Sequence, residues 1–122
     1  MQEGENIINN ISVYKYDLPH GRIRSSIFRI GKVAWLTDIN LITDDVINNL
    51  EGLDYLFLDC LMYNKYPSHL SVEEAFYYAK LIRAKNTYLI HMTHILNYNV
   101  LSKQCPNNVY VAYDGLRLFS SL

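Results

Sequence analysis

A helical segment between two short apolar strands is the feature that most restricts how this chain can fold. Ser71 and Glu74 have the S-x-x-E spacing of a capping box, in which each side chain satisfies a free backbone N–H at a helix start. Apolar residues then recur at helical spacing as far as Ile82. Residues 55–58 and 87–90, on either side, are typical of strands, and the first is expected to be covered on both faces. The chain therefore predicts a layered fold of the α/β or α+β class.

Further β-rich runs and turns extend this alternation. The runs are residues 11–17, 26–30, 33–37, 109–113 and 116–119. The dipeptides at 31–32 (Gly-Lys) and 114–115 (Asp-Gly) each predict a two-residue hairpin connection. Thr43 is placed to cap a short helix, and residues 97–103 predict one more helical turn. No linker or repeat divides the 122 residues, so one domain is expected, with residues 1–10 poorly ordered.

Composition argues against several classes of partner. Eleven Lys and Arg against twelve Asp and Glu give a net charge of −1, so no basic patch for nucleic acid or an anionic membrane is predicted. No apolar run approaches the roughly 20 residues that cross a bilayer. The first ten residues lack the basic and apolar regions of a signal peptide. A cytoplasmic location is therefore expected, with Cys60 and Cys105 as reduced thiols that fill space as small apolar residues.

Several predicted strands run directly into a residue that can bind a metal or carry a proton. These residues are His20, Asp38, Asp59 and His91. Ligand sites gather in the loops beyond strand ends, because the sheet fixes their positions there. Imidazole and carboxylate suit zinc or manganese, and a carboxylate can bridge two ions. The competing interpretations are a turn role for each Asp and a core or surface role for each His, including His94, three residues after His91.

Six motifs, in this order and spacing, resemble those of PhnP-like proteins of the metallo-β-lactamase fold. They are HG at 20–21, VAWLTD at 33–38, LEGLDYLFLDC at 50–60, SHLSVEEA at 68–75, TYLIHMTH at 87–94 and AYDGL at 112–116. The resemblance covers nearly the whole chain from about residue 11. It implies the C-terminal half of an αββα sandwich, which is one mixed sheet with flanking helices.

The resemblance also implies roles for individual side chains. Three residues match metal ligands of the family: His20, Asp38 and His91. Asp38 is the one that would bridge two divalent ions, zinc or manganese. His69 matches a pocket histidine that acts as general acid or binds phosphate, whereas the residues alone favour a loop histidine before a capped helix. Asp59 and His94 match positions beside the site. The implied reaction is hydrolysis of a small phosphodiester by metal-activated water.

One hallmark of the family is missing from this sequence. The HxHxDH motif supplies most ligands to both ions, and none of the four histidines has that spacing. Each ion would keep only two protein ligands, with Asp38 shared between them. A catalytic zinc site has three protein ligands and a water, so metal binding by this chain is expected to be weak or absent. We therefore expect the chain alone to be inactive.

Half of a sandwich would also expose the apolar inner face of its sheet. We therefore expect self-association, or a partner chain that carries the N-terminal half. The alternative function is a non-catalytic remnant or interaction module that keeps the half-fold without metal chemistry. The four retained residues favour descent from an active enzyme: His20, Asp38, His69 and His91.

Overall fold

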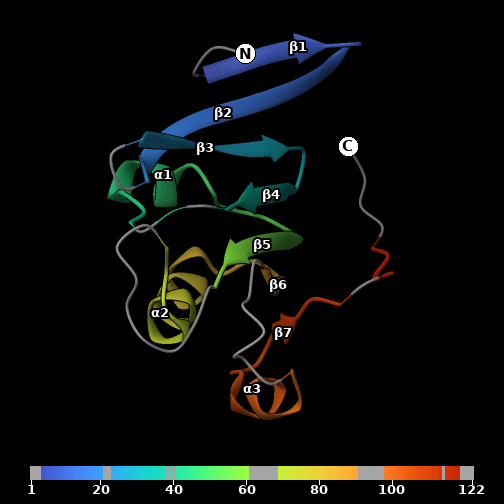
Figure 1. Ribbon diagram of the computed structural model, residues 1–122. Coiled ribbons are helices and arrows are strands. Elements are labelled where there is room, and N and C mark those ends of the chain that lie inside the picture. Colours follow the sequence, from blue (N-terminus) through green and yellow to red (C-terminus); the bar gives the residue numbers. More distant parts are fainter. Residues whose placement is uncertain are drawn as a thin grey trace.

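A computed structural model describes residues 4–20, 23–37, 39, 41–60, 69–90, 98–113 and 115–118, with the backbone alone described for 16–20 and 23–26. Within these ranges the strands are β1 (Gly4–Ile8), β2 (Ile11–His20), β3 (Ile23–Ile30), β4 (Val33–Leu36), β5 (Tyr55–Asp59), β6 (Asn86–Ile90) and β7 (Val109–Val111). The helices are α1 (Asp44–Asn48), α2 (Val72–Ile82) and α3 (Tyr98–Gln104). The chain thus forms one sheet with flanking helices (Figure 1). None of the described helices is long and apolar enough to cross a membrane.

The sheet is mixed, as the sequence predicts, and its strands follow chain order from β1 to β7. Strands β1 to β4 pair antiparallel, while β4, β5, β6 and β7 pair parallel. Leu36 pairs with Leu58, and Asp59 pairs with Ile90, so β4, β5 and β6 end at one edge, here called the carboxyl edge. Leu36 also pairs with Ile27, and β2 and β3 continue past this point as far as His20. The end of β2 and the start of β3 therefore lie at the carboxyl edge too.

The N-terminal residues include a strand that the sequence analysis did not predict. Gly4–Ile8 form β1, which pairs with β2 in unbroken register. Asn9 and Asn10 have φ of 50° and 65°, the left-handed conformation that a two-residue hairpin turn needs and that Asn tolerates. Pairing with β2 gives the backbone groups of this segment hydrogen-bond partners.

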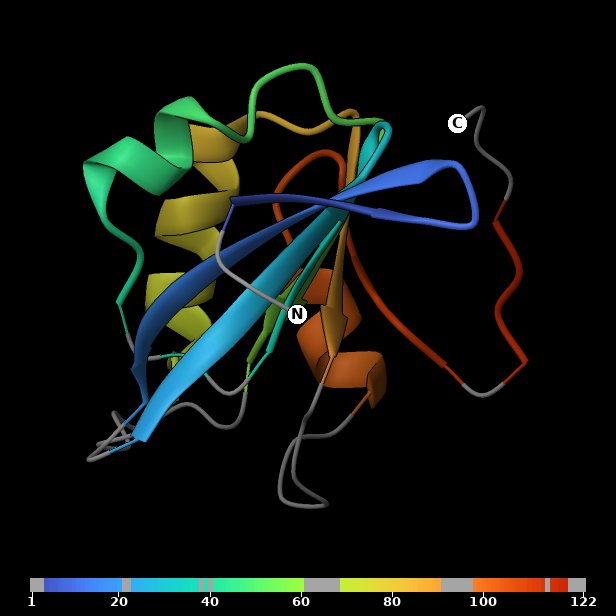
Figure 2. The same cartoon turned by 90° about the horizontal axis from the view of Figure 1, so that it is seen from above.

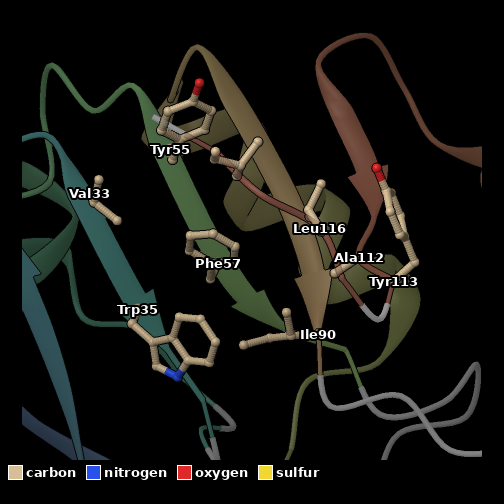
Figure 3. Close-up of a pocket in the computed structure, with 9 residues that line it drawn as sticks. Val33, Trp35, Tyr55, Phe57, Ile90, Ala112, Tyr113 and Leu116 are labelled. Atoms are coloured by element: carbon tan, nitrogen blue, oxygen red, sulfur yellow. The ribbon is translucent and has the colours of Figure 1, made fainter. Parts of the chain in front are cut away.

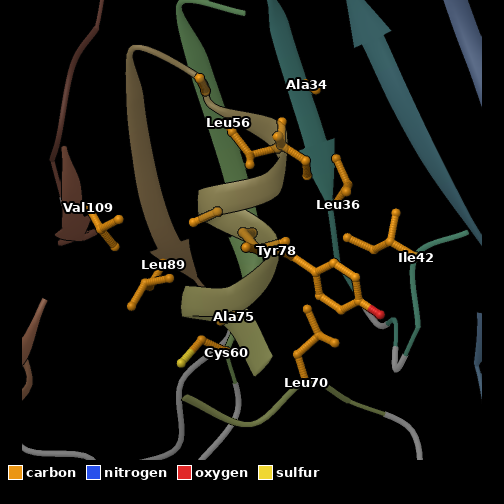
Figure 4. Close-up of a cluster of buried hydrophobic side chains, with 14 of the residues drawn as sticks. Ala34, Leu36, Ile42, Leu56, Cys60, Leu70, Ala75, Tyr78, Leu89 and Val109 are labelled. Atoms are coloured by element: carbon orange, nitrogen blue, oxygen red, sulfur yellow. The ribbon is translucent and has the colours of Figure 1, made fainter. Parts of the chain in front are cut away.

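The core lies between the sheet and helices α1 and α2, which cover one face (Figures 2 and 4). Alternate residues of the parallel strands point into it: Ala34, Leu36, Leu56, Leu58, Leu89, Val109 and Val111. Ala75, Tyr78 and Ile82 of α2 pack against them, and Leu101 brings α3 into the same cluster. This period-2 alternation fixes which side chains face the opposite side of the sheet.

Two strand predictions are corrected by this arrangement. Residues 55–58 are not covered on both faces, since Tyr55 and Phe57 are only half-buried and lie on the face away from the helices. The predicted C-terminal hairpin is also wrong, because β7 pairs parallel with β6 and residues 115–118 form no strand. The Leu116 N–H donates to the carbonyl of Tyr113, which makes a turn in place of a return strand.

The capping box predicted at the start of α2 is confirmed. The Glu74 N–H donates to Ser71 Oγ over 3.2 Å, and the Ser71 N–H donates to Glu74 Oε1 over 3.0 Å. Both backbone groups would otherwise lack an intrahelical partner. The box therefore fixes where α2 begins, two residues after His69.

Ser71→Ala should lower the free energy of unfolding by about 1 kcal/mol, because the Glu74 N–H loses its acceptor. Urea denaturation followed by circular dichroism measures this change. Glu74→Gln is the matched control, since glutamine keeps an oxygen for the Ser71 N–H, and it should lie within about 0.5 kcal/mol of the parent protein. Equal losses in the two variants would contradict a stabilising role for the serine hydroxyl.

Candidate active site

Asp59 and His69 form a hydrogen-bonded pair at the carboxyl edge of the sheet. Asp59 is the last residue of β5 and is 0% exposed, and the side chain of His69 is 12% exposed. His69 Nδ1 lies 3.0 Å from Asp59 Oδ2. The same oxygen accepts a longer bond of 3.4 Å from the Leu70 N–H. A buried carboxylate is thus hydrogen-bonded to the Nδ1 edge of the imidazole.

The local fold explains how two residues ten positions apart meet. β5 is a central strand whose apolar residues anchor it to the core, so its last residue has a fixed position. The backbone N–H of Cys60 donates to the carbonyl of Ile90 over 3.0 Å and continues the pairing with β6 past Asp59. On the other side, the capping box sets the start of α2, and fully buried Leu70 lies between it and His69. His69 is therefore held between a strand end and a helix start.

The hydrogen bond determines which nitrogen of His69 carries the proton. A carboxylate accepts hydrogen bonds and donates none, so Nδ1 is the protonated nitrogen when Asp59 is ionised. In the neutral ring Nε2 then has the lone pair, and in the charged ring Nε2 has the second proton. A carboxylate in this position also fixes the rotation of the ring. The pair can therefore give or take a proton at Nε2.

The predicted metal ligands are not described by the structure. Asp38, His91 and His94 lie outside the described residues, and so does the side chain of His20. Within the described ranges there is no group of three or more His, Cys, Asp or Glu residues that could hold a metal ion. The backbone does place β4 and β6, the strands that lead to Asp38 and His91, on either side of β5, so that all three strands end at the carboxyl edge. Convergence of these side chains on a metal site stays a prediction.

The hydrogen bond between Asp59 and His69 was not predicted from the sequence. Sequence reasoning placed both residues near a site but assigned no contact between them. Nothing in residues 61–68 sets the distance between the end of β5 and the start of α2. One signal in the sequence could have predicted this contact: an Asp at the end of a strand, followed by a His two residues before a capping box.

Cys60, which follows Asp59, is a buried apolar residue, as predicted. Burial raises the pKa of its thiol to about 12, with smaller contributions from the negative charge of Asp59 and from Cys105. Burial also raises the pKa of Cys105. The thiolate is the reactive form of cysteine, so Cys60 has no nucleophilic role at neutral pH.

At pH 8, Cys60 should resist iodoacetamide in the folded protein, because a thiol with a pKa of about 12 is ionised in only on the order of one molecule in 10,000. Labelling should rise as pH approaches 12, since the thiolate fraction grows tenfold with each pH unit below the pKa. Mass spectrometry of the Cys105→Ser variant isolates the signal of Cys60, and unfolding in urea should give full labelling. Rapid labelling of the folded variant at pH 8 would show that the thiol is accessible and ionised.

Comparison with known proteins identifies the family. The described residues form one mixed sheet with helices packed on one face and a hydrogen-bonded Asp–His pair at its carboxyl edge. A model of the beta-lactamase superfamily domain matches residues 9–92. The chain belongs to this superfamily, and its solved neighbours have the metallo-β-lactamase fold.

Two solved structures illustrate the match. A diphosphatase of the PhnP family is 30% identical, with a TM-score of 0.96, and the match covers 100% of this chain and 48% of that one. YhfI of Bacillus subtilis, a metallo-β-lactamase fold protein, is 20% identical with a TM-score of 0.80, over 95% of this chain and 53% of that one. This chain therefore spans about half the length of the solved proteins that it matches.

A curated relative is much longer. An octanoyltransferase of Porphyromonas gingivalis is 30% identical over 111 residues, which are 89% of this chain but only 23% of that protein. Its name thus describes a protein in which the matched segment is a minor part.

Asp59→Asn should weaken the preference for the Nδ1-protonated tautomer of His69, because the amide can present either its oxygen or its NH₂ group to the ring. The ¹⁵N chemical shifts of the imidazole, assigned with His69→Asn, report the tautomer. Asp54→Asn serves as the control and should leave those shifts unchanged. Asp54 lies away from this site, and its carboxylate oxygen is 3.3 Å from Nζ of Lys85. Identical shifts in Asp59→Asn and the parent protein would show that the carboxylate does not direct the proton.

Proposed function

We propose that this chain is the part of a metal-dependent phosphodiesterase that carries the proton donor, with His69 as general acid and Asp59 as the residue that positions it. The observation that carries this proposal is the 3.0 Å bond between Nδ1 of His69 and buried Asp59 at the carboxyl edge. The similarity to a diphosphatase of the PhnP family supports phosphate ester chemistry. The proposal concerns the completed fold, of which this chain spans about half.

The candidate metal ligands are of residue types that bind divalent metal ions. His20, Asp38 and His91 offer two imidazoles and one carboxylate, which are ligands that zinc and manganese accept. The strands that precede Asp38 and His91 end at the same edge as β5. Remaining ligands would come from the half that this chain does not span. When bound, such ions supply an activated water and offset negative charge on the phosphoryl group.

His69 supplies the proton for the leaving oxygen, which these ions do not supply. As the bond between phosphorus and the leaving oxygen breaks, its electron pair moves to that oxygen. The oxygen takes the proton from Nε2 of the imidazolium, which becomes neutral, and an alcohol leaves. Asp59 keeps Nδ1 protonated throughout and holds the ring in one orientation. Because the carboxylate is buried, solvent does not compete for that hydrogen bond.

His69→Asn should lower kcat by about 10²–10⁴-fold on a phosphodiester with an alkyl leaving group, because an alkoxide needs the proton. The loss should be much smaller on bis(p-nitrophenyl) phosphate, whose nitrophenolate leaves without one. The assay uses added Mn²⁺ and the chain joined to the unmatched half of the PhnP-family diphosphatase. Glu73→Gln, at an exposed position in the first turn of α2, is the control and should retain full turnover on both substrates.

Equal losses on both substrates would contradict a proton-donor role and leave His69 a structural residue. The chain alone should give no turnover of bis(p-nitrophenyl) phosphate. Turnover by the chain alone that disappears in Asp38→Ala would overturn this expected inactivity.

The competing function is a non-catalytic remnant or interaction module that keeps the half-fold without metal chemistry. The metal content of the completed protein distinguishes the phosphodiesterase from the non-catalytic module. A completed protein that folds but contains no metal and has no turnover would support the module.

A further inference from the structure

A crevice on the helical side of the sheet lies outside the site at the carboxyl edge. It runs between α2 and residues 104–109, which lead from the end of α3 into β7, and its volume is about 860 Å³. Pockets for small organic molecules have volumes of roughly 300–1,000 Å³. The aromatic side chains of Figure 3 lie on the opposite face of the sheet. The crevice therefore has the size of a ligand site and is separate from that face.

The first residues of two neighbouring strands form the floor of the crevice. Thr87 of β6 and Val109 of β7 are register partners, and both are buried. The Thr87 N–H donates to the carbonyl of Asn108 over 2.8 Å, which holds the segment before β7 against the start of β6. β5, β6 and β7 are parallel, so the floor lies at the edge of the sheet opposite to the carboxyl edge, where His69 lies.

The walls of the crevice are apolar near the floor and aromatic near the rim. On α2, Ala79 is buried, Phe76 is half-buried and Tyr77 is 59% exposed. Pro106 lines the crevice from the segment before β7. Aromatic side chains bind flat rings by stacking, and this contact is available to every nucleobase because each has a π-face. These walls therefore suit a flat aromatic ring.

Two basic side chains line the crevice at the C-terminal end of α2. Lys80 and Arg83 are both exposed, and neither has an ion-pair partner among the residues that the structure describes. Of the described lining residues, Glu73 alone is acidic. It lies near the start of α2, about 15 Å from Arg83 along the helix axis at 1.5 Å per residue. The charges therefore favour an anion at the Arg83 end of the crevice.

The backbone of Arg83 has a conformation that disfavours a side chain. Arg83 ends α2 with φ of 59° and ψ of 39°, the left-handed conformation in which glycine is the commonest residue. Its N–H donates to the carbonyl of Ala79, and glycine would make the same bond. Lys80 already places a positive charge in the last turn, opposite the helix dipole. The helix end thus does not need the guanidinium, and strained residues of this kind gather at ligand sites.

We propose that this crevice binds a nucleoside monophosphate, with the phosphate on Arg83 and Lys80 and the base on the apolar floor. A guanidinium binds two phosphate oxygens through parallel N–H donors, and an ammonium adds a point charge. Asn107 and Asn108 line the crevice and are exposed, so their amides present donors and acceptors to the edge of a base. This site is independent of the function proposed for His69.

Isothermal titration calorimetry of the chain with AMP tests the proposal, in EDTA so that no metal ion contributes. AMP should bind at one site with a Kd below about 1 mM. Inorganic phosphate and adenosine, titrated separately, should each bind at least about tenfold more weakly, because each makes only part of the contacts. Phosphate that binds as tightly as AMP would overturn the role of the apolar floor. Adenosine that binds as tightly would overturn the role of the two bases.

Arg83→Gly separates ligand binding from stability, because glycine suits the left-handed helix end. The variant should bind AMP about 10–100-fold more weakly, the loss expected for a charged hydrogen bond, and should unfold at a temperature a few degrees higher. Lys80→Gln should weaken binding to a smaller extent. Lys32→Gln is the control, since it removes the same charge from an exposed position outside the crevice, and it should bind AMP as the parent protein does.

The absence of saturable binding up to roughly 10 mM AMP would overturn the proposal. AMP binding that both Arg83→Gly and Lys80→Gln leave unchanged would also overturn it, because the nucleotide would then bind elsewhere on the chain. Weaker binding in Arg83→Gly together with a lower unfolding temperature would show that the arginine is a structural residue, which contradicts the proposed role.

Discussion

The parallel pairing of β4, β5 and β6 is the constraint on which the rest of the structure depends. Its register places the apolar residues Leu36, Leu58 and Leu89 on the helical face, where they are fully buried. The same register brings the ends of the three strands to one edge, where Asp59 meets His69. A shift of one residue in any of these strands would reverse its faces, placing leucines in solvent and aromatic rings in the core. The core and the site are thus set by one pairing.

Much of the fold could be predicted from local patterns. The capping box at Ser71 and the turn at Gly31 depend on neighbours in the sequence, and both are as predicted. The failures depend on contacts between distant residues. Asp114-Gly115 favours a hairpin, yet β7 pairs with β6, and no local signal reports that choice. Residues 55–58 were predicted to be buried on both faces, because the alternating Leu and Phe are equally apolar. Hydrophobicity alone therefore did not distinguish the helical face of the strand from the open one.

Both residues of the hydrogen-bonded pair were singled out in the sequence, but the contact between them was not predicted. Strand-ending Asp59 and pre-helical His69 were both identified, whereas their bond depends on how residues 61–68 join a strand to a helix, which sequence spacing does not fix. The roles of His20, Asp38 and His91 depend on the family resemblance, and comparison with known proteins supports that family. The tyrosines gave no functional signal in the sequence, and the stacking of Tyr88 with Phe57 and Tyr110 exists only once their strands are aligned.

The close succession of His69, Leu70 and Ser71 ties the chemistry to an ordinary helix cap. The serine hydroxyl faces the backbone of Glu74 and not the imidazole, yet it fixes the end of the segment on which the imidazole is carried. Fraying of the first turn of α2 would therefore release the ring from its carboxylate long before the core opened.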